Sequence, residues 1–190
     1  FIDSELQVAE KDEKKYSGQF VNSAISLNDK NSSAAIIGGG DGGVARECLT
    51  KGFDLIDWYE LDPEVVKVCH KHLPKICGEV KANNNVKCYW GDAFESIKTV
   101  KDSKYDKIFV DLNDDQYCIN LAAKNMKALK RILKTDGVIT AQVGCMSKKP
   151  KQVNGWLKVL SENFGNSKLD EVFIPSFDCR WNFASSIMNS

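Results

Sequence analysis

An apolar run that ends in a glycine-rich turn, with one carboxylate inside the turn, offers bare backbone to a ligand. The segment Ile36–Val44 reads I-I-G-G-G-D-G-G-V, so an expected strand ends in five glycines and Asp41 before an expected helix. Glycines permit positive φ angles and lack the Cβ atoms that would hold a nucleotide-like ligand away, although a tight turn without a ligand is the alternative. The start of a helix attracts anions, which Asp41 would repel. Asp41 therefore indicates a ligand with a cationic group, bound close to Gly38 and Gly40.

Two further acids, Glu60 and Asp92, follow apolar runs at points suited to binding a nucleoside. In a doubly wound sheet the ligand lies outside the carboxyl ends of the strands, so a polar residue that closes a strand points toward it. Glu60 stands about 20 residues after the glycine turn, the spacing at which an acid accepts hydrogen bonds from ribose hydroxyls. A helix cap is the alternative, but Asp62 and Pro63 suit that role. Asp92 would accept a hydrogen bond from an adenine amine or, alternatively, cap a helix over 93–100.

Asp111 closes another apolar run and opens a cluster of three carboxylates in five residues, Asp111–Asp115. Like charges raise one another's pKa and together attract cations, so a polyamine or a metal ion would suit the cluster. We expect no metal, because no histidine is near in the sequence and the spacing does not match a calcium-binding loop. A solvated turn is the alternative interpretation.

The composition argues against several classes of partner. Lysine plus arginine equals aspartate plus glutamate at 26 each, so no overall charge draws the chain to nucleic acid or to anionic lipid. The seven cysteines form no C-x-x-C pair, which predicts reduced thiols and a cytoplasmic location. No apolar stretch approaches the roughly 20 residues that span a bilayer, so we expect no membrane association. At 190 residues the chain fits one main domain with a full core.

Short β-rich runs alternate with helical ones, which is typical of βαβ units that form a mostly parallel sheet. The expected strands cover 34–38, 54–60, 85–90, 106–111, 136–142, 169–174 and 181–187. The expected helices cover 12–25, 43–51, 63–72, 93–100, 118–133 and 150–164. Residues 1–8 are expected to form a strand or part of a hairpin, and 77–85 a polar surface connection. The pattern predicts an α/β, Rossmann-like fold: a seven-stranded, mostly parallel sheet with helices on both faces.

Together these residues resemble the spermidine/spermine synthase family of aminopropyltransferases, which have the fold of AdoMet-dependent methyltransferases. The most specific match is the family signature G-G-G-D-G-G-x-x-R-E, present at Gly38–Glu47. The family motifs L-D-G-x-x-Q-x-x-E-x-D-E-x-x-Y, V-E-I-D, G-D-[GA]-x and Y-D-x-I-x-x-D have similar segments at Ile2–Tyr16, Tyr59–Asp62, Gly91–Phe94 and Tyr105–Asp111. The resemblance implies that residues 1–30 are the remnant of an N-terminal β segment with a first helix. A Rossmann-like catalytic domain would then cover 31–190.

Within the family, the chain leans toward the spermine synthases of animals. The segments that carry this lean are Leu112, Cys77–Val80, and Ile174–Phe177 with Trp181 and Phe183. The gatekeeping D-S-S-D-P-x-G-P segment of spermidine synthases stands here as D-L-N-D-D-Q-Y at Asp111–Tyr117, which keeps both acids and loses the proline and glycine residues. The family's small N-terminal β-domain is also expected to be missing, apart from about its last strand.

For the donor, the resemblance implies decarboxylated AdoMet as a co-substrate and no tightly bound cofactor. Glu60 would hold the ribose, Asp92 with Ala93 the adenine, and Gln7 the sugar or the donor's side chain. Asp41 would pair with the amine of the aminopropyl arm. Intact AdoMet would place a carboxylate beside Asp41, and two carboxylates in contact are unfavourable in a poorly solvated site, so Asp41 would select against it.

For the acceptor, the resemblance implies a polyamine, with spermidine favoured over putrescine, and methylthioadenosine as the released product. Asp111 would orient the acceptor amine and accept its proton as the catalytic base. Tyr16, Asp41 and Asp114 would hold substrate amines, with Asp178 at the distal end. A homodimer is compatible with the family. The alternatives are an AdoMet-dependent methyltransferase and a catalytically weak or non-enzymatic domain that binds nucleoside or polyamine.

Overall fold

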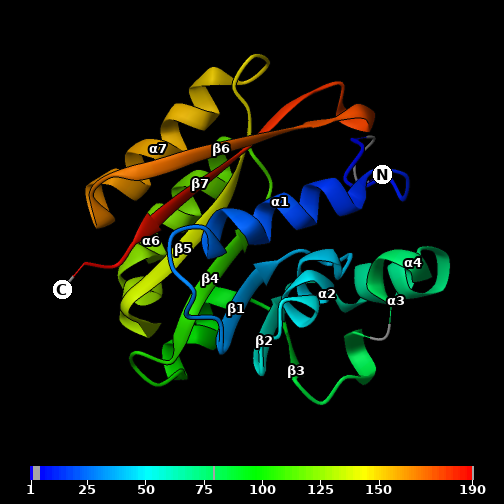
Figure 1. Ribbon diagram of the computed structural model, residues 1–190, viewed down its shortest axis with the longest axis horizontal. Helices are drawn as coiled ribbons and strands as arrows, with labels where there is room; N and C mark the ends of the chain where they lie inside the picture. Colours follow the sequence, from blue (N-terminus) through cyan, green and yellow to red (C-terminus); the bar gives the residue numbers. More distant parts are fainter. Residues whose placement is uncertain (2–4, 79, 190) are drawn as a thin grey trace.

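The computed structural model describes residues 1, 5–78 and 80–189, which are organised around one seven-stranded sheet (Figure 1). The strands lie in the order β3-β2-β1-β4-β5-β7-β6. Neighbours from β3 to β5 are parallel, whereas β7 runs antiparallel to both β5 and β6. The strand bounds are β1 Ser33–Gly38, β2 Leu55–Glu60, β3 Val86–Trp90, β4 Tyr105–Asp111, β5 Leu133–Cys145, β6 Ser167–Ile174 and β7 Cys179–Ile187. The predicted α/β fold with a mostly parallel sheet is confirmed.

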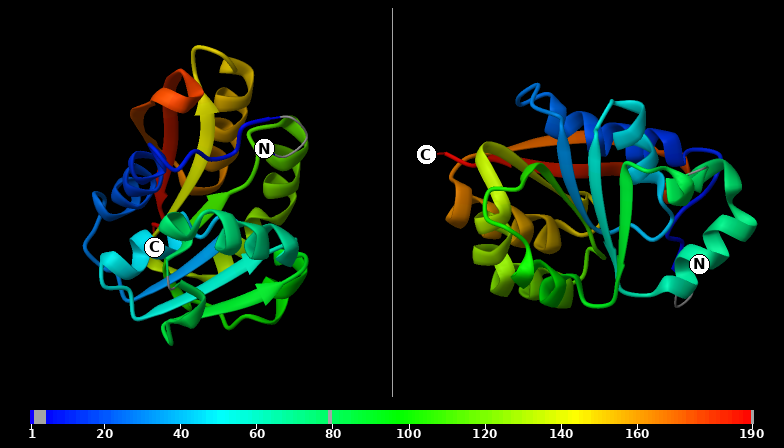
Figure 2. Two further views of the ribbon diagram at one scale, coloured as in Figure 1. Left: turned by 90° about the vertical axis from the view of Figure 1, so that its right-hand side faces the viewer. Right: turned by 90° about the horizontal axis from the view of Figure 1, so that it is seen from below.

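Helices cover both faces of this sheet. The α-helices are α1 Glu13–Ile25, α2 Gly43–Thr50, α3 Pro63–His72, α4 Pro74–Cys77, α5 Ala93–Ser96, α6 Gln116–Ile132 and α7 Pro150–Phe164. The described residues also form the 3-10 turns η1 Val80–Ala82, η2 Ile97–Thr99 and η3 Pro175–Phe177. The right-hand view of Figure 2 shows α1 and α2 on one side of the strands and α6 and α7 on the other. Of the described residues, none belongs to a helix long and apolar enough to cross a membrane.

Each face of the sheet has its own apolar core. On one face Phe20 of α1 packs among buried residues of β1, β2 and α2, including Ile36. On the other face Val110 of β4 and Trp156 of α7 belong to a second cluster. Burying a side chain such as Phe20 contributes about 1.5–3 kcal/mol. Because both faces of β1 and β4 are covered, these strands are apolar and buried along nearly their whole length, and the polar residues at their ends stand out.

Two segments differ from the expected elements. The helix expected over 93–100 is one α-helical turn, α5, followed by the 3-10 turn η2. The segment 77–85, expected to be a surface connection, contains η1 and the end of α4. Helical turns form there because Ile76 and Val80 are apolar and are buried against the molecule.

The first residues are described only in part. Glu5 forms an isolated β-bridge, and residues 6–8 are neither helix nor strand. Ile2, Asp3 and Glu79, which belong to the motifs quoted above, lie outside the described residues. The strand or hairpin segment expected over 1–8 is therefore wrong at residues 6–8. At residues 2–4 it stays a prediction. The α1 helix packs across β5, β6 and β7 and against α2. It therefore covers the same sheet as the later helices do.

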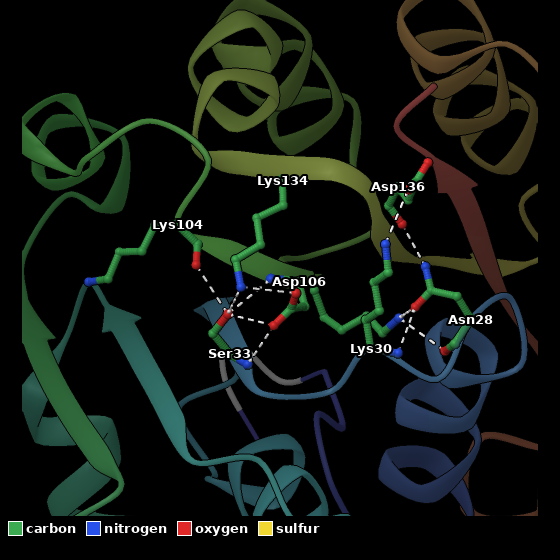
Figure 3. A network of polar contacts seen from close by, with 8 residues as sticks. Asn28, Lys30, Ser33, Lys104, Asp106, Lys134 and Asp136 are labelled. Atoms are coloured by element: carbon green, nitrogen blue, oxygen red, sulfur yellow. Dashed lines mark hydrogen bonds and ion pairs between the residues drawn. The ribbon is translucent and has the colours of Figure 1, made fainter. Parts of the chain in front are cut away.

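A polar network ties together the amino ends of the central strands (Figure 3). Asp106 of β4 accepts hydrogen bonds from the Ser33 N–H at 3.0 Å and hydroxyl at 2.8 Å, and from Lys134 Nζ at 3.0 Å. Lys107 is fully buried, and its Nζ donates to the Asn28 carbonyl at 3.2 Å. Burial lowers the pKa of Lys107 to about 8. Because these charges have partners within the network, we interpret it as structural support for the strands.

Candidate functional site

A cavity of about 1060 Å³ opens at the carboxyl ends of β1, β2 and β4. We call it the central cavity. The carboxyl ends of parallel strands meet at one edge of a sheet, so acids far apart in sequence converge there. Every site residue predicted from the sequence, with the exception of Asp178, lines the central cavity: Gln7, Tyr16, Gly38, Gly40, Asp41, Glu60, Asp92, Ala93, Asp111 and Asp114.

The glycine turn, Gly38–Gly43, allows acids to approach the backbone closely. Gly39 has a φ of 69°, which glycine adopts readily. A Cβ added at Gly39 would lie 2.8 Å from Asp111 Oδ2, and one at Gly40 would lie 3.1 Å from Glu60 Oε2. A side chain at either position would therefore displace an acid of the site. Close packing with these acids thus requires small residues in the turn, in addition to any requirement set by a ligand.

Asp41 carries its carboxylate in the glycine turn, where the residue is half-buried. Its Oδ1 accepts a hydrogen bond from the Gly43 N–H at 2.7 Å. Burial is the main influence that raises the pKa of Asp41; Glu13 and Glu60 also raise it, whereas the Gly43 hydrogen bond and Arg46 lower it, and the net pKa is about 6. A cationic ligand group beside Asp41 would favour the ionised form. The position therefore suits a cation better than a neutral or anionic group.

Asp111 ends β4 and accepts a hydrogen bond from a tyrosine of α1. Tyr16 Oη donates to Asp111 Oδ1 at 2.7 Å. Burial and the nearby charge of Asp41 raise the pKa of Asp111 to about 7, while the Tyr16 hydrogen bond acts to lower it. Burial and the charge of Asp111 hold the pKa of Tyr16 well above its ordinary value, so the tyrosine stays a hydrogen-bond donor. The Asp111 carboxyl can therefore exchange a proton near neutral pH.

Glu60 and Asp92 line the central cavity where β2 and β3 end. Glu60 Oε1 accepts from the Asp62 N–H at 2.9 Å, and burial raises the pKa of Glu60. Asp62 in turn caps α3 by accepting from the Glu64 N–H at 2.9 Å, as predicted, so Glu60 is not used as that cap. Asp92 does act as a helix cap, because its Oδ1 accepts from the Phe94 N–H at 2.8 Å. Asp92 thus has a structural role while it also lines the cavity.

Gln142 of β5 is a residue of the cavity wall that the sequence analysis missed. Its Nε2 donates to the Leu112 carbonyl, and its Oε1 accepts from Trp181 Nε1 at 3.1 Å. Gln142 therefore joins the loop after β4 to β7. A single amide side chain within the apolar end of an expected strand, A-Q-V, is the signal that could have identified it.

Glu13 and Arg46 form an ion pair between α1 and α2 that the sequence analysis missed. Arg46 Nη1 lies 2.8 Å from Glu13 Oε2 and donates to the Ile76 carbonyl at 2.7 Å. Ser17 Oγ donates to Glu13 Oε1 at 2.5 Å. The pair links α1, which carries Tyr16, to α2, which follows the glycine turn, so it helps to fix the position of Tyr16 relative to that turn. The R-E at the end of the family signature was the available signal.

Asp114 and Asp178, the two distal acids of the prediction, are placed differently. Asp114 lines the cavity and pairs with Lys149, whose Nζ lies 3.2 Å from Asp114 Oδ1. Asp178 follows η3 with a φ of 48°, is exposed, and does not belong to the cavity wall. The structure therefore does not bring Asp178 together with the other predicted site residues.

Several known proteins are similar to this chain in sequence. Residues 13–189 match the sequence model of the Spermine/spermidine synthase domain. The polyamine aminopropyltransferase of Prochlorococcus marinus strain MIT 9312 is 35% identical over 185 residues, which cover 92% of this chain and 64% of the relative. That of strain MIT 9301 is 35% identical over 186 residues, which cover 93% of this chain and 64% of the relative. The chain therefore spans less than two thirds of the length of these relatives.

Solved structures match the fold. Spermidine synthase from Thermotoga maritima superposes with a TM-score of 0.86 at 21% identity, over 96% of this chain and 62% of that structure. A spermidine synthase in complex with the transition-state analogue AdoDATO superposes with a TM-score of 0.84, also at 21% identity, with the same coverage of both chains. Because the domain match extends over all of α1 to β7, the chain belongs to the spermine/spermidine synthase family.

Proposed function

We propose that this chain catalyses aminopropyl transfer from decarboxylated AdoMet to an amine of a polyamine, with release of methylthioadenosine. The observation that carries the proposal is the placement of Asp41 and Asp111 on one cavity. One acid lies in the glycine turn, where a nucleoside donor would bind, and the other ends the neighbouring strand. A cation of the donor and an amine of the acceptor would each have a carboxylate partner. The family and the names of the curated relatives support the same reaction.

On the donor side, each residue would contact a different part of the nucleoside. Glu60 would accept hydrogen bonds from the ribose hydroxyls, Asp92 with Ala93 would contact the adenine, and Gln7 would lie beside the sugar or the donor's side chain. Asp41 would bind the primary ammonium of the aminopropyl arm. An α-carboxylate on that arm, as in intact AdoMet, would meet the Asp41 carboxylate in a poorly solvated place, which is unfavourable.

On the acceptor side, the reaction needs an unprotonated amine. The amine nitrogen would attack the donor carbon bonded to the sulfonium sulfur; the C–N bond forms, the C–S bond breaks, and the sulfur keeps the electron pair in the neutral thioether product. The amine loses one proton, which Asp111 would accept. A carboxyl with a pKa of about 7 is a better base at neutral pH than an ordinary aspartate, whose pKa is 3.8. Preassembly of both reactants in line contributes as well.

We propose spermidine as the preferred acceptor. The central cavity, at about 1060 Å³, has space for a long flexible amine beside a nucleoside. The segment Ile174–Phe177 with Trp181 resembles spermine synthases, and Phe177 and Trp181 lie on the cavity wall. Asp178 lies outside that wall, so this preference depends on the apolar wall and on Asp111 and Asp114.

The experiment that tests the proposed function is a product assay on the purified protein. The protein is incubated with decarboxylated AdoMet and with putrescine or spermidine, and methylthioadenosine and the new polyamine are measured. Stoichiometric formation of both products supports aminopropyl transfer. Methylation of an acceptor with AdoMet would support the methyltransferase alternative. Binding of donor and amine without turnover would instead indicate the non-enzymatic binding domain.

A further inference from the structure

Lys149 places an ammonium group of the protein itself inside the central cavity. It stands just before α7, and its backbone N–H donates to the Cys145 carbonyl at 2.8 Å, which fixes the start of the side chain. Its Nζ reaches Asp114 Oδ1 at 3.2 Å. Both residues line the cavity. Asp114, an acid suited to a substrate ammonium, is therefore already paired with a cation of the chain.

The two carboxylate oxygens of Asp114 are not equally available. Oδ2 is buried and has no hydrogen-bond partner within the described part of the chain. It lies against Gly144, where an added Cβ would be 2.7 Å from it. Oδ1 is the oxygen that Lys149 holds. Because Oδ2 is closed off by the backbone of β5, an ammonium of a ligand that approaches Asp114 has to compete with Lys149 for Oδ1.

The competitor and the ligand are chemically alike. A lysine side chain carries a primary ammonium on a four-carbon stem, which is the same end group that a diamine or triamine presents. The Lys149 side chain is 41% exposed, whereas that of Asp114 is 13% exposed, so the lysine can turn toward solvent while the acid stays in the wall. Exchange of one ammonium for another at Oδ1 is therefore sterically open. Because the ion pair between Lys149 and Asp114 has to be broken first, the ligand binds more weakly by the free energy of that pair.

We infer that Lys149 determines acceptor selectivity by competing with the acceptor's distal ammonium for Asp114. This inference rests on the proposed function, because it takes a polyamine as the ligand of this side of the cavity. An acceptor that places an ammonium at Asp114 binds more weakly than the carboxylates alone would allow. An acceptor too short to reach Asp114 is not affected by Lys149. The lysine thus changes relative affinities among polyamines and leaves the reacting amine at Asp111 untouched.

The test compares Lys149→Met, which keeps the stem and removes the charge, with Lys151→Met. Lys151 is two residues along the chain, is exposed and lies outside the cavity wall, so it is a matched control for the loss of one positive charge. Calorimetry with putrescine and with spermidine gives the dissociation constants. We expect Lys149→Met to bind spermidine, which is long enough to engage both Asp111 and Asp114, about threefold or more tightly than the wild type does. That gain is the scale of one partly exposed ion pair. Lys151→Met should bind as the wild type does.

Further variants separate the possible outcomes. Lys149→Arg keeps the charge, so its affinity should stay close to that of the wild type, and Lys149→Met combined with Asp114→Asn should lose the gain. If Lys149→Met binds neither amine more tightly than the wild type, or if Lys151→Met shows the same gain, the inference is overturned. The assay measures binding without turnover. Absence of aminopropyl transfer would therefore count against the proposed function, while the calorimetric comparison would still decide the role of Lys149.

Discussion

Tyr16 Oη donates a hydrogen bond to Asp111 Oδ1 at 2.7 Å, which joins residues 95 positions apart in the chain. The tyrosine comes from α1 and the acid from the end of β4, so the bond depends on how the first helix packs on the sheet. It acts against the other influences on Asp111, because burial and Asp41 raise the pKa of that carboxyl and the Tyr16 bond lowers it. The pair therefore sets the pH at which Asp111 can accept a proton.

The Tyr16→Phe variant tests whether the Tyr16 hydrogen bond lowers the pKa of Asp111. Asp111 accepts a proton only when it is ionised, so activity should fall as pH falls through about 7, the pKa of Asp111 in the free protein. Loss of the Tyr16 hydrogen bond removes an influence that lowers this pKa. The acidic limb of the kcat/KM profile should therefore move to higher pH in Tyr16→Phe. A limb that stays at the wild-type position would argue that the bond does not tune Asp111.

The Asp111→Asn variant tests the base itself. Asparagine keeps the shape of the side chain and cannot accept the amine proton. We expect kcat to fall by roughly 10² or more while the affinity for the donor changes little. The acidic limb near pH 7 should also disappear from the profile. Turnover close to that of the wild type would remove Asp111 from the mechanism.

The raised pKa values of Asp41 and Asp111 also predict how the stability of the unliganded protein depends on pH. In the folded protein these carboxyls have pKa values of about 6 and about 7, whereas the unfolded chain has the ordinary value of 3.8. Between these limits the folded state binds more protons, so the free energy of unfolding falls as pH rises through 6 and 7. Thermal melts at pH 5.5 and pH 8 measure the difference. It should be smaller in Asp111→Asn, and an equal difference in both proteins would contradict the assignment.

Much of the fold and of the site follows from the sequence because parallel strands bring their carboxyl ends to one edge. Asp41, Glu60, Asp92 and Asp111 each follow an apolar run, so their convergence on one cavity was predictable from their places at the ends of parallel strands. The seven strands were predictable for a related reason. With both faces covered, the central ones read as continuous apolar runs between turn residues.

The parts that were not predictable depend on contacts between loops. Lys149 meets Asp114 because the segment before α7 and the loop after β4 adopt particular conformations, which no periodicity records. Gln142 contacts the Leu112 carbonyl for a similar reason. Asp178 was assigned from an acid near a family-like ending, but its left-handed backbone conformation is part of a turn that leaves it exposed.

Donor selectivity is the prediction that follows from Asp41. The wild type should bind decarboxylated AdoMet at least about tenfold more tightly than AdoMet, a difference of about 1.4 kcal/mol, because only AdoMet brings a second carboxylate to this position. Asp41→Asn removes the repulsion and the attraction together, so the ratio of the two affinities should narrow. Calorimetric titration of both donors into both proteins measures it. Equal affinities of the wild type for the two donors would rule out selection by Asp41.

The preference for spermidine over putrescine is predicted from both the size and the charges of the central cavity. Spermidine has one ammonium more than putrescine and more methylene surface, so it can engage Asp111 and Asp114 while its chain packs on the wall formed by Phe177 and Trp181. We therefore expect kcat/KM for spermidine to exceed that for putrescine at a fixed, saturating concentration of donor. Phe177→Ala should reduce the difference, because it removes apolar wall and keeps the hydrogen bonds of Gln142 to Trp181 and to the loop after β4. The preference is falsified if putrescine is used as efficiently as spermidine by the wild-type protein.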